Sequence, residues 1–175
     1  MTSSELDLSS LIMLCIPGIF LIFLVLSLAF AIRIVPEYAR MAVFRLGRYI
    51  GARGPGMILL IPFIDRGVQV DLRDQTEKIE AELTTQDNAH LSVELNFGYR
   101  IVSPDDSLLN VPNLSAAARE TAVNRLKSLG GSRSYADVIH ARGEMETELK
   151  NRLAEVLKQW GCEVTLVEFL DIRRN

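Results

Sequence analysis

The longest apolar stretch of the sequence runs from Leu11 to Ile32 and contains no charged residue. An ideal helix over this range would measure about 33 Å, compared with about 30 Å for the hydrocarbon core of a bilayer. The pattern therefore predicts a single transmembrane anchor over residues 11–32, preceded by a short acidic segment over residues 1–10. The anchor positions that we single out are Leu11, Pro17, Gly18, Phe20, Phe23, Leu26, Phe30 and Ile32.

Three other interpretations of this stretch were weighed. A cleavable signal peptide fits poorly because the apolar run is too long and no basic residue precedes it. A lipoprotein signal fails because Cys15 follows Leu14 instead of a small residue. A re-entrant hairpin that turns at Pro17 and Gly18 stays open, although its first arm would measure only about 10 Å. A kinked, continuous helix fits the lengths better, because membrane helices tolerate proline where neighbouring groups satisfy the freed carbonyl.

Charges beside the anchor predict its direction in the membrane. No Lys or Arg precedes it, whereas Arg33, Arg40, Arg45 and Arg48 follow closely. The positive-inside rule then places the C-terminal part in the cytoplasm. We expect a single-pass protein with its N-terminus outside, in the inner membrane of a prokaryote.

After the anchor, residues 34–103 have the alternation and turn residues of β-strands. Gly54-Pro55-Gly56 is the strongest break, and the apolar run Met57–Ile61 behind it predicts a short, fully buried strand. A long strand over Leu91–Val102 would place every second side chain on one face. The other predicted strands are Met41–Leu46, Val68–Arg73 and Lys78–Leu83. A largely antiparallel sheet is the simplest arrangement of these strands.

Beyond Pro104 the periodicity becomes helical. Asn113 is placed to cap a helix that ends near Leu129, and Ser134 is placed to cap a short helix over residues 135–140. Residues 142–160 carry one apolar stripe, formed by Met145, Leu149, Leu153, Val156 and Trp160. A last strand over residues 162–172 is predicted to alternate at Val164, Leu166 and Glu168, and residues 173–175 form a tail. This order predicts an α+β domain with a helical subdomain over residues 104–172.

Composition and motifs argue against catalysis. The formal charge is −3, and the part after the anchor is nearly neutral, so no electrostatic footprint for nucleic acid is present. The sequence has no nucleophile elbow, zinc-protease helix or phosphate-binding loop, and we predict no cofactor and no metal site. Cys162 with His140 is a conceivable nucleophile pair, whereas helix capping explains Ser134 better than a pair with Lys127 does. A thiol hydrolase that uses Cys162 is therefore kept as a remote alternative.

Short motifs fall in a familiar order between Ile34 and Ile172. They include Val35–Arg40, Phe44–Arg48, Gly54–Gly56, Val70–Arg73 and Trp160–Val164. In this order and spacing the sequence resembles the stomatin/prohibitin/flotillin (SPFH, band 7) family, and within it the stomatin-like (slipin) branch. The matching positions that we expect to be architectural are Pro36, Glu37, Gly47, Arg48, Gly54, Pro55, Gly56, Pro62, Asp65, Asp71, Arg73, Asp87, Trp160, Gly161 and Asp171.

Three of these features carry a physical expectation. Gly54 and Gly56 would permit positive φ in the turn. Asp71 and Arg73 lie on one face of their strand, where they could pair with a neighbouring strand or subunit. The apolar stretch Ile58–Phe63 is expected to be buried core, with contact with the bilayer interface as the alternative.

The resemblance implies a scaffold rather than an enzyme. Members of this family form homo-oligomers, organise membrane microdomains and regulate partner membrane proteins. In prokaryotes the implied partners include membrane proteases of the NfeD type, so a regulatory subunit of such a protease is the alternative function. Family members continue into a long Ala/Glu-rich helix after the last strand, whereas this sequence stops at Asn175. We expect assembly through that helix to be absent from this sequence.

Overall fold

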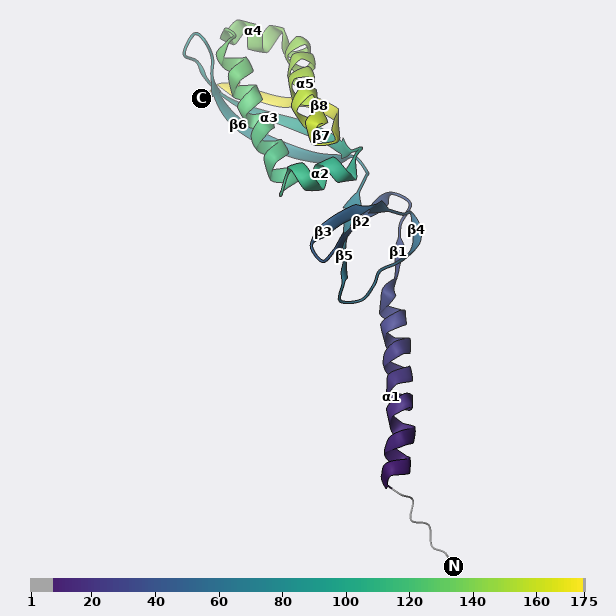
Figure 1. Cartoon of the computed structure of the whole chain (residues 1–175). Coiled ribbons are helices and arrows are strands. Elements are labelled where there is room, and N and C mark those ends of the chain that lie inside the picture. The colour runs from purple at the N-terminus through teal and green to yellow at the C-terminus, as the bar shows by residue number, and fades with distance from the viewer. Residues whose placement is uncertain (1–7, 175) are drawn as a thin grey trace, which may run out of the picture. The chain divides into compact units, whose positions relative to one another are not determined.

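The computed structural model describes the backbone of residues 8–174 (Figure 1). Residues 1–7, within the predicted acidic segment, and Asn175 in the predicted tail lie outside the described residues, as does the side chain of Leu11. The chain divides into two compact units, residues 1–69 and residues 70–175. We describe each unit by itself.

The first unit begins with helix α1 (Leu8–Ala31), which continues through Pro17 without a break. Its described apolar side chains are largely exposed, Ile16, Phe20 and Phe23 among them. Judged by length together with hydropathy, no helix within the described residues is able to cross a membrane. The transmembrane anchor at residues 11–32 therefore stays a prediction. Ile32, its last predicted residue, lies in strand β1.

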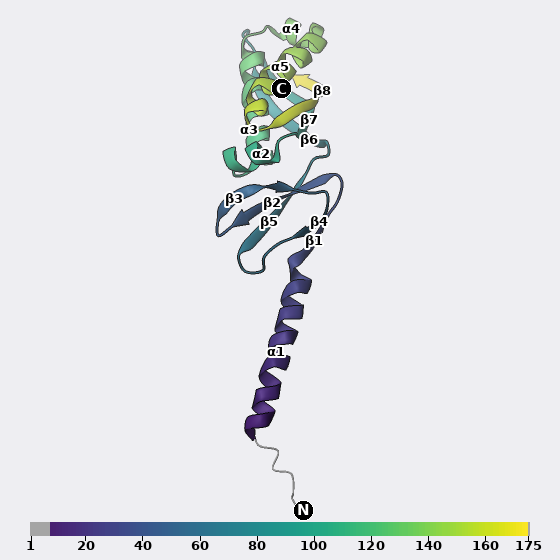
Figure 2. The ribbon, with the colours of Figure 1, turned by 45° about the vertical axis from the view of Figure 1, so that its right-hand side comes forward.

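Two small sheets complete the first unit. Strand β1 (Ile32–Val35) pairs with β4 (Gly56–Leu59) to form a two-stranded antiparallel ribbon. Strands β2 (Ala39–Arg45), β3 (Arg48–Arg53) and β5 (Asp65–Asp71) form the second sheet in the order β3-β2-β5. Figures 1 and 2 show the ribbon at the C-terminal end of α1. The buried cluster between these strands is small and consists of Val35, Ala39, Met41, Val43, Ile58 and Leu60.

The turn before β4 has the predicted backbone, because φ is +109° at Gly54 and +108° at Gly56. The prediction of a fully buried strand over Met57–Ile61 is wrong. Ile58 and Leu60 are buried, whereas Met57, Leu59 and Ile61 are exposed. A two-stranded ribbon that packs on the cluster with one face leaves its other face open, so an apolar sequence there does not produce burial.

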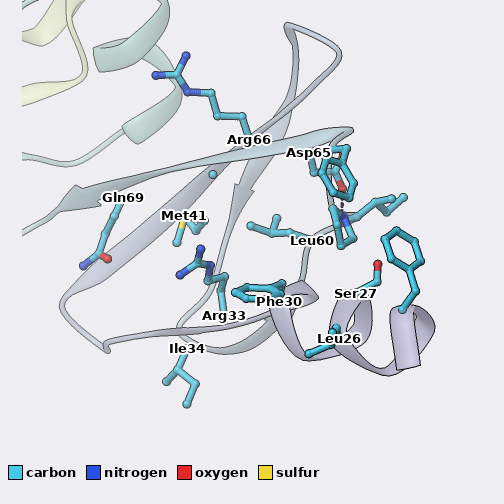
Figure 3. Close-up of a pocket in the computed structure, with 15 residues that line it drawn as sticks. Leu26, Ser27, Phe30, Arg33, Ile34, Met41, Leu60, Asp65, Arg66 and Gln69 are labelled. Atoms are coloured by element: carbon cyan, nitrogen blue, oxygen red, sulfur yellow. Dashed lines mark hydrogen bonds between the residues drawn. The ribbon is translucent and has the colours of Figure 1, made fainter. Parts of the chain in front are cut away.

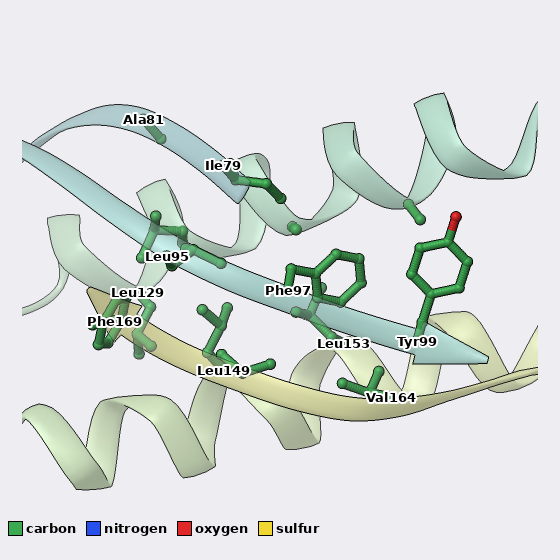
Figure 4. Packing of buried hydrophobic residues seen from close by; sticks show 14 of the residues in the cluster. Ile79, Ala81, Leu95, Phe97, Tyr99, Leu129, Leu149, Leu153, Val164 and Phe169 are labelled. Atoms are coloured by element: carbon green, nitrogen blue, oxygen red, sulfur yellow. The ribbon is translucent and has the colours of Figure 1, made fainter. Parts of the chain in front are cut away.

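The second unit is a three-stranded antiparallel sheet with helices packed on one face. Strands β6 (Gln75–Thr84), β7 (His90–Ile101) and β8 (Cys162–Arg174) form an antiparallel sheet in that order. Helices α3 (Leu114–Gly131) and α5 (Arg142–Gln159) cover one face, and α2 (Pro104–Asn110) and α4 (Tyr135–His140) connect the layers. Side chains from all three strands point to these helices (Figure 4).

Local signals in this unit were read correctly. Asn113 accepts a hydrogen bond from the Ala116 N–H at 3.2 Å, and Ser134 accepts one from the Asp137 N–H at 3.2 Å, so both predicted helix caps form. In α5 the buried residues are Met145, Leu149, Leu153 and Leu157, whereas the predicted Val156 and Trp160 are only partly buried.

Strand β8 departs from the predicted alternation. The buried residues are Val164, Val167 and Phe169, whereas Leu166 and Glu168 are exposed. Its pairing with β7 shifts at Gly98/Tyr99 and again at Glu94/Leu95. Each shift inserts one residue as a β-bulge, which moves the following side chains to the opposite face. A side chain at position 98 would meet Thr165 Oγ1 at 2.8 Å, so glycine is required beside the first bulge.

The boundary between the units lies near residue 70, although the sequence pattern predicted subdomains over 34–103 and 104–172. The reason is the pairing of β7 with β8, which joins strands far apart in the chain. Strands β6 and β7 consequently belong with the helices.

Candidate functional site

Many large apolar side chains of the first unit are exposed, although its buried cluster is small. Within the described part of the unit, ten large apolar side chains outside α1 are exposed, and we call seven of them the apolar rim. The rim consists of Ile32, Ile34, Leu46, Met57, Leu59, Ile61 and Phe63. Exposed apolar patches of this kind usually mark surfaces that contact a membrane or a partner.

Four residues of the rim lie on one face of the β1–β4 ribbon. The register pairs Ile32 with Leu59 and Ile34 with Met57, so the four side chains point to the same side. Ile34 and Met57 are 80% and 77% exposed. The ribbon therefore presents a continuous apolar face, directly where the chain leaves α1.

The two most exposed rim residues occupy turns with a left-handed backbone. Phe63 is 94% exposed with φ of +66°, and Leu46 is 82% exposed with φ of +48°. For residues other than glycine this region costs about 1–2 kcal/mol, and bulky side chains rarely adopt it. Leu46 with Gly47, whose φ is +83°, forms the two-residue hairpin turn between Arg45 and Arg48. Asn, Asp or Gly usually fills the first position of such a turn. Strained, exposed apolar residues of this kind indicate a function.

Asp65 holds both turns in place. Its carboxylate accepts hydrogen bonds from Arg45 Nε at 2.8 Å and Nη2 at 3.0 Å, and from the Ile61 N–H at 3.0 Å. The Leu46 N–H donates to the Ile64 carbonyl at 3.0 Å, which joins the two turns directly. The Asp65 side chain is 2% exposed. The hydrogen bond from Arg45, followed by that from the Ile61 N–H, lowers the pKa of Asp65 to about 2.

The first unit also exposes positive charge, on residues next in sequence to, or a few residues from, the rim positions. Arg33, Arg48 and Arg66 are exposed, and within the described residues none of the three forms an ion pair. Apolar side chains flanked by free arginines are the combination that binds a membrane surface with anionic lipids. The sequence had suggested contact of Ile58–Phe63 with the bilayer interface only as an alternative, because hydrophobicity alone indicates burial.

The remaining predicted positions of the first unit shape its turns. Pro36 accepts a hydrogen bond from the Ala39 N–H at 3.1 Å, and the Glu37 carbonyl accepts one from Arg40 at 3.1 Å. The bond from Gly54 to Pro55 is cis. Pro62 lies inside the turn that presents Phe63.

In the second unit, one predicted position ties a turn between strands to a helix, and others form local ion pairs. Asp87 accepts hydrogen bonds from the Tyr135 N–H at 3.1 and 3.2 Å, which ties the β6–β7 turn to α4. A hydrogen bond from the Thr85 hydroxyl is the main cause that lowers the pKa of Asp87. Asp71 and Arg73 form an ion pair with each other at 2.6 Å. Asp171 pairs with Arg173 at 2.5 Å.

Trp160 and Gly161 end helix α5. Gly161 has φ of +68°, and its carbonyl accepts hydrogen bonds from the N–H groups of Val102 and Ser103 at 2.8 and 2.9 Å. An added Cβ would lie 2.6 Å from the Ser103 carbonyl oxygen. This glycine therefore joins α5 to the end of β7.

Cys162 is a core residue at the start of β8. Burial raises the pKa of its thiol to about 11, and its Sγ lies 3.5 Å from the Trp160 carbonyl oxygen. A thiol that stays protonated is a poor nucleophile, so this geometry does not favour the hydrolase alternative. A search of the described residues finds no cluster of metal-ligating side chains.

Comparison with known proteins finds one matching family and several relatives with related names. Residues 33–175 match the family described as SPFH domain / Band 7. A stomatin homolog of Pyrococcus horikoshii is 35% identical over 158 residues, which cover 90% of this chain and 59% of the relative. Stomatin-like protein 1 of Homo sapiens is 39% identical over 140 residues, covering 79% and 35%. Stomatin-2 of Caenorhabditis elegans is 34% identical over 150 residues, covering 84% and 40%. The chain thus spans less than two thirds of each of these relatives.

Proposed function

Because the chain belongs to the SPFH domain / Band 7 family with stomatin-like relatives, we propose that it is a membrane-attached, non-enzymatic scaffold whose first unit contacts the bilayer. The observation that carries this proposal is the pair of exposed, left-handed apolar residues Leu46 and Phe63, held by Asp65. Exposure of these side chains to water is unfavourable. At a bilayer interface their transfer from water is favourable.

Helix α1 is the deeper part of the attachment. Its exposed apolar side chains support insertion into the hydrocarbon core, and the arginines after it support an orientation with residues 33–175 in the cytoplasm and the N-terminus outside. Protease protection of a tag placed before Met1 in sealed vesicles tests the orientation. Digestion of that tag from the cytoplasmic side would contradict the proposed orientation.

Contact of the rim with lipid can be measured residue by residue. Phe63→Cys and Leu46→Cys are made in a Cys15→Ser background, labelled with a polarity-sensitive fluorophore, and reconstituted into vesicles that contain brominated lipid. Cys162 is buried and should label poorly. We expect quenching at both positions. Ile139→Cys, a 39% exposed apolar position on α4, is the matched control and should not be quenched. Equal quenching at positions 63 and 139 would contradict the proposal.

The scaffold function is homo-oligomerisation and organisation of partner membrane proteins, supported by the edge strands β6 and β8 of the second unit, which offer backbone groups to another chain. Regulation of a membrane protease, of the NfeD type or another, is the second candidate, which the family resemblance favours. Cross-linking in native membranes followed by identification of partners distinguishes them. A strictly monomeric chain without membrane partners would contradict both, and altered cleavage after deletion would favour the protease.

A further inference from the structure

A groove of about 840 Å³ lies in the first unit between the C-terminal half of α1 and the strands that follow (Figure 3). Its floor includes Met41 and Leu60, which also belong to the small buried cluster. The groove is therefore an open side of that cluster. A cluster this small leaves unsatisfied apolar surface that an apolar ligand could cover.

The groove has an apolar wall that runs along the helix. Phe23, Leu26 and Phe30 repeat at three- and four-residue steps, so they share one face of α1, and Phe63 also lines the groove. This wall extends over roughly 10 Å of helix. An elongated hydrocarbon chain parallel to α1 fits such a wall, whereas a compact polar ligand does not.

One end of the groove carries free positive charge. Arg33 follows α1 by two residues, and Figure 3 shows its guanidinium turned inward near Met41. No ion pair involves Arg33 among the described residues. Asp65, the acidic residue of the lining, is already paired with Arg45. Arg66 also lines the groove, but Figure 3 shows its guanidinium turned away, which leaves Arg33 to receive an anion.

We propose that this groove binds one anionic phospholipid, with its phosphate on the Arg33 guanidinium and one acyl chain along Phe30, Leu26 and Phe23. Guanidinium binds phosphate oxygens in a bidentate geometry, and the charge lies where the helix leaves the hydrocarbon region. This inference rests on the proposed membrane attachment and adds a defined lipid site to it. The rim would then contact bulk lipid, while the groove holds one specific molecule.

The test uses the full chain in nanodiscs with trace phosphatidylglycerol or phosphatidylcholine that carries a diazirine on its acyl chain. Cross-linked peptides are identified by mass spectrometry. We expect phosphatidylglycerol to label residues 23–34 and 60–63 more than phosphatidylcholine. Arg33→Gln should reduce this preference roughly five-fold, as expected for one basic residue near a membrane surface. Arg33→Lys should retain part of it.

Arg48→Gln is the matched control, because Arg48 is exposed in the same unit but does not line the groove. An equal loss in Arg48→Gln, or equal labelling by the two lipids, would overturn the lipid site. Competition by inorganic phosphate would also overturn it, in favour of a simple anion site. Fluorescence quenching at position 63 is read in the same samples. Quenching without lipid preference removes only the groove site, whereas loss of quenching removes the membrane contact on which it rests.

Discussion

The two units handle the same kind of apolar residue in opposite ways. In the second unit, Phe97, Leu149 and Leu153 are completely buried between sheet and helices. In the first unit, Phe63 and Leu46 project from strained turns, and an apolar face of the β1–β4 ribbon stays open. The buried apolar residues of the second unit stabilise its fold. The exposed apolar residues of the first unit lie open to whatever surrounds the protein. The difference teaches that a hydrophobic side chain favours leaving water, but that its hydrophobicity does not specify whether it enters the protein core or another apolar environment.

The largest expected effect comes from creating a cavity in the core of the second unit. Phe97→Ala should lower the free energy of unfolding by about 4 kcal/mol, because the residue is fully buried and the cavity cannot collapse completely. Urea denaturation followed by circular dichroism measures the change. Phe63→Ala, which removes the same atoms from a 94% exposed site, is the control. A loss of similar size at position 63 would abolish the distinction between the units.

A backbone substitution in the second unit should have the next largest effect. Gly161→Ala places a Cβ 2.6 Å from the Ser103 carbonyl at a φ of +68°, so we expect a loss of about 2–4 kcal/mol. Gly143→Ala, in helix α5 with open space around it, should instead be neutral or stabilise by up to about 1 kcal/mol. Thermal denaturation of both variants provides the measurement. Equal behaviour of the two would contradict the packing described for α5 and β7.

Acid should loosen the first unit through Asp65. The folded pKa of about 2 lies below the ordinary value of 3.8, so its contribution to stability is fully present above pH 4. That contribution should be lost as the pH falls from 4 toward 2. A fluorophore at position 63 reports the loosening of the turn in detergent. Asp65→Asn should show the loosened signal at every pH and lack this acid step. An unchanged step in that variant would assign it to another carboxylate.

The smallest expected effect separates stability from membrane contact. Leu46→Asn replaces a strained residue with one that favours the left-handed turn, and should stabilise the first unit by about 0.5–1 kcal/mol. The same change removes an apolar side chain from the rim. Lipid-dependent quenching of a label at position 63, read beside the unfolding curve, should therefore decrease. Parallel changes of both quantities would contradict opposing roles for Leu46.

The sequence predicts local features of this molecule well and distant ones poorly. The caps at Asn113 and Ser134 follow from hydrogen bonds within three residues, so they were identified correctly. The two bulges that shift β8 depend on its pairing with β7, more than sixty residues away, and were missed.

The candidate site follows the same rule. The glycines of the turn at residues 54–56 were predicted, because positive φ is a property of the residue itself. The exposure of Phe63 was not, because burial depends on what covers a side chain. The pairing of Asp65 with Arg45 joins residues twenty positions apart and leaves no local pattern.

Helix α1 continues into the ribbon without an intervening residue, since Ala31 ends the helix and Ile32 begins β1. The Leu60 N–H also bonds the Ala31 carbonyl at 2.8 Å, which splices β4 onto the last turn of the helix. No loop therefore separates the helix from the ribbon. If α1 enters a bilayer as proposed, a tilt of the helix would be passed to the ribbon through this connection and this hydrogen bond.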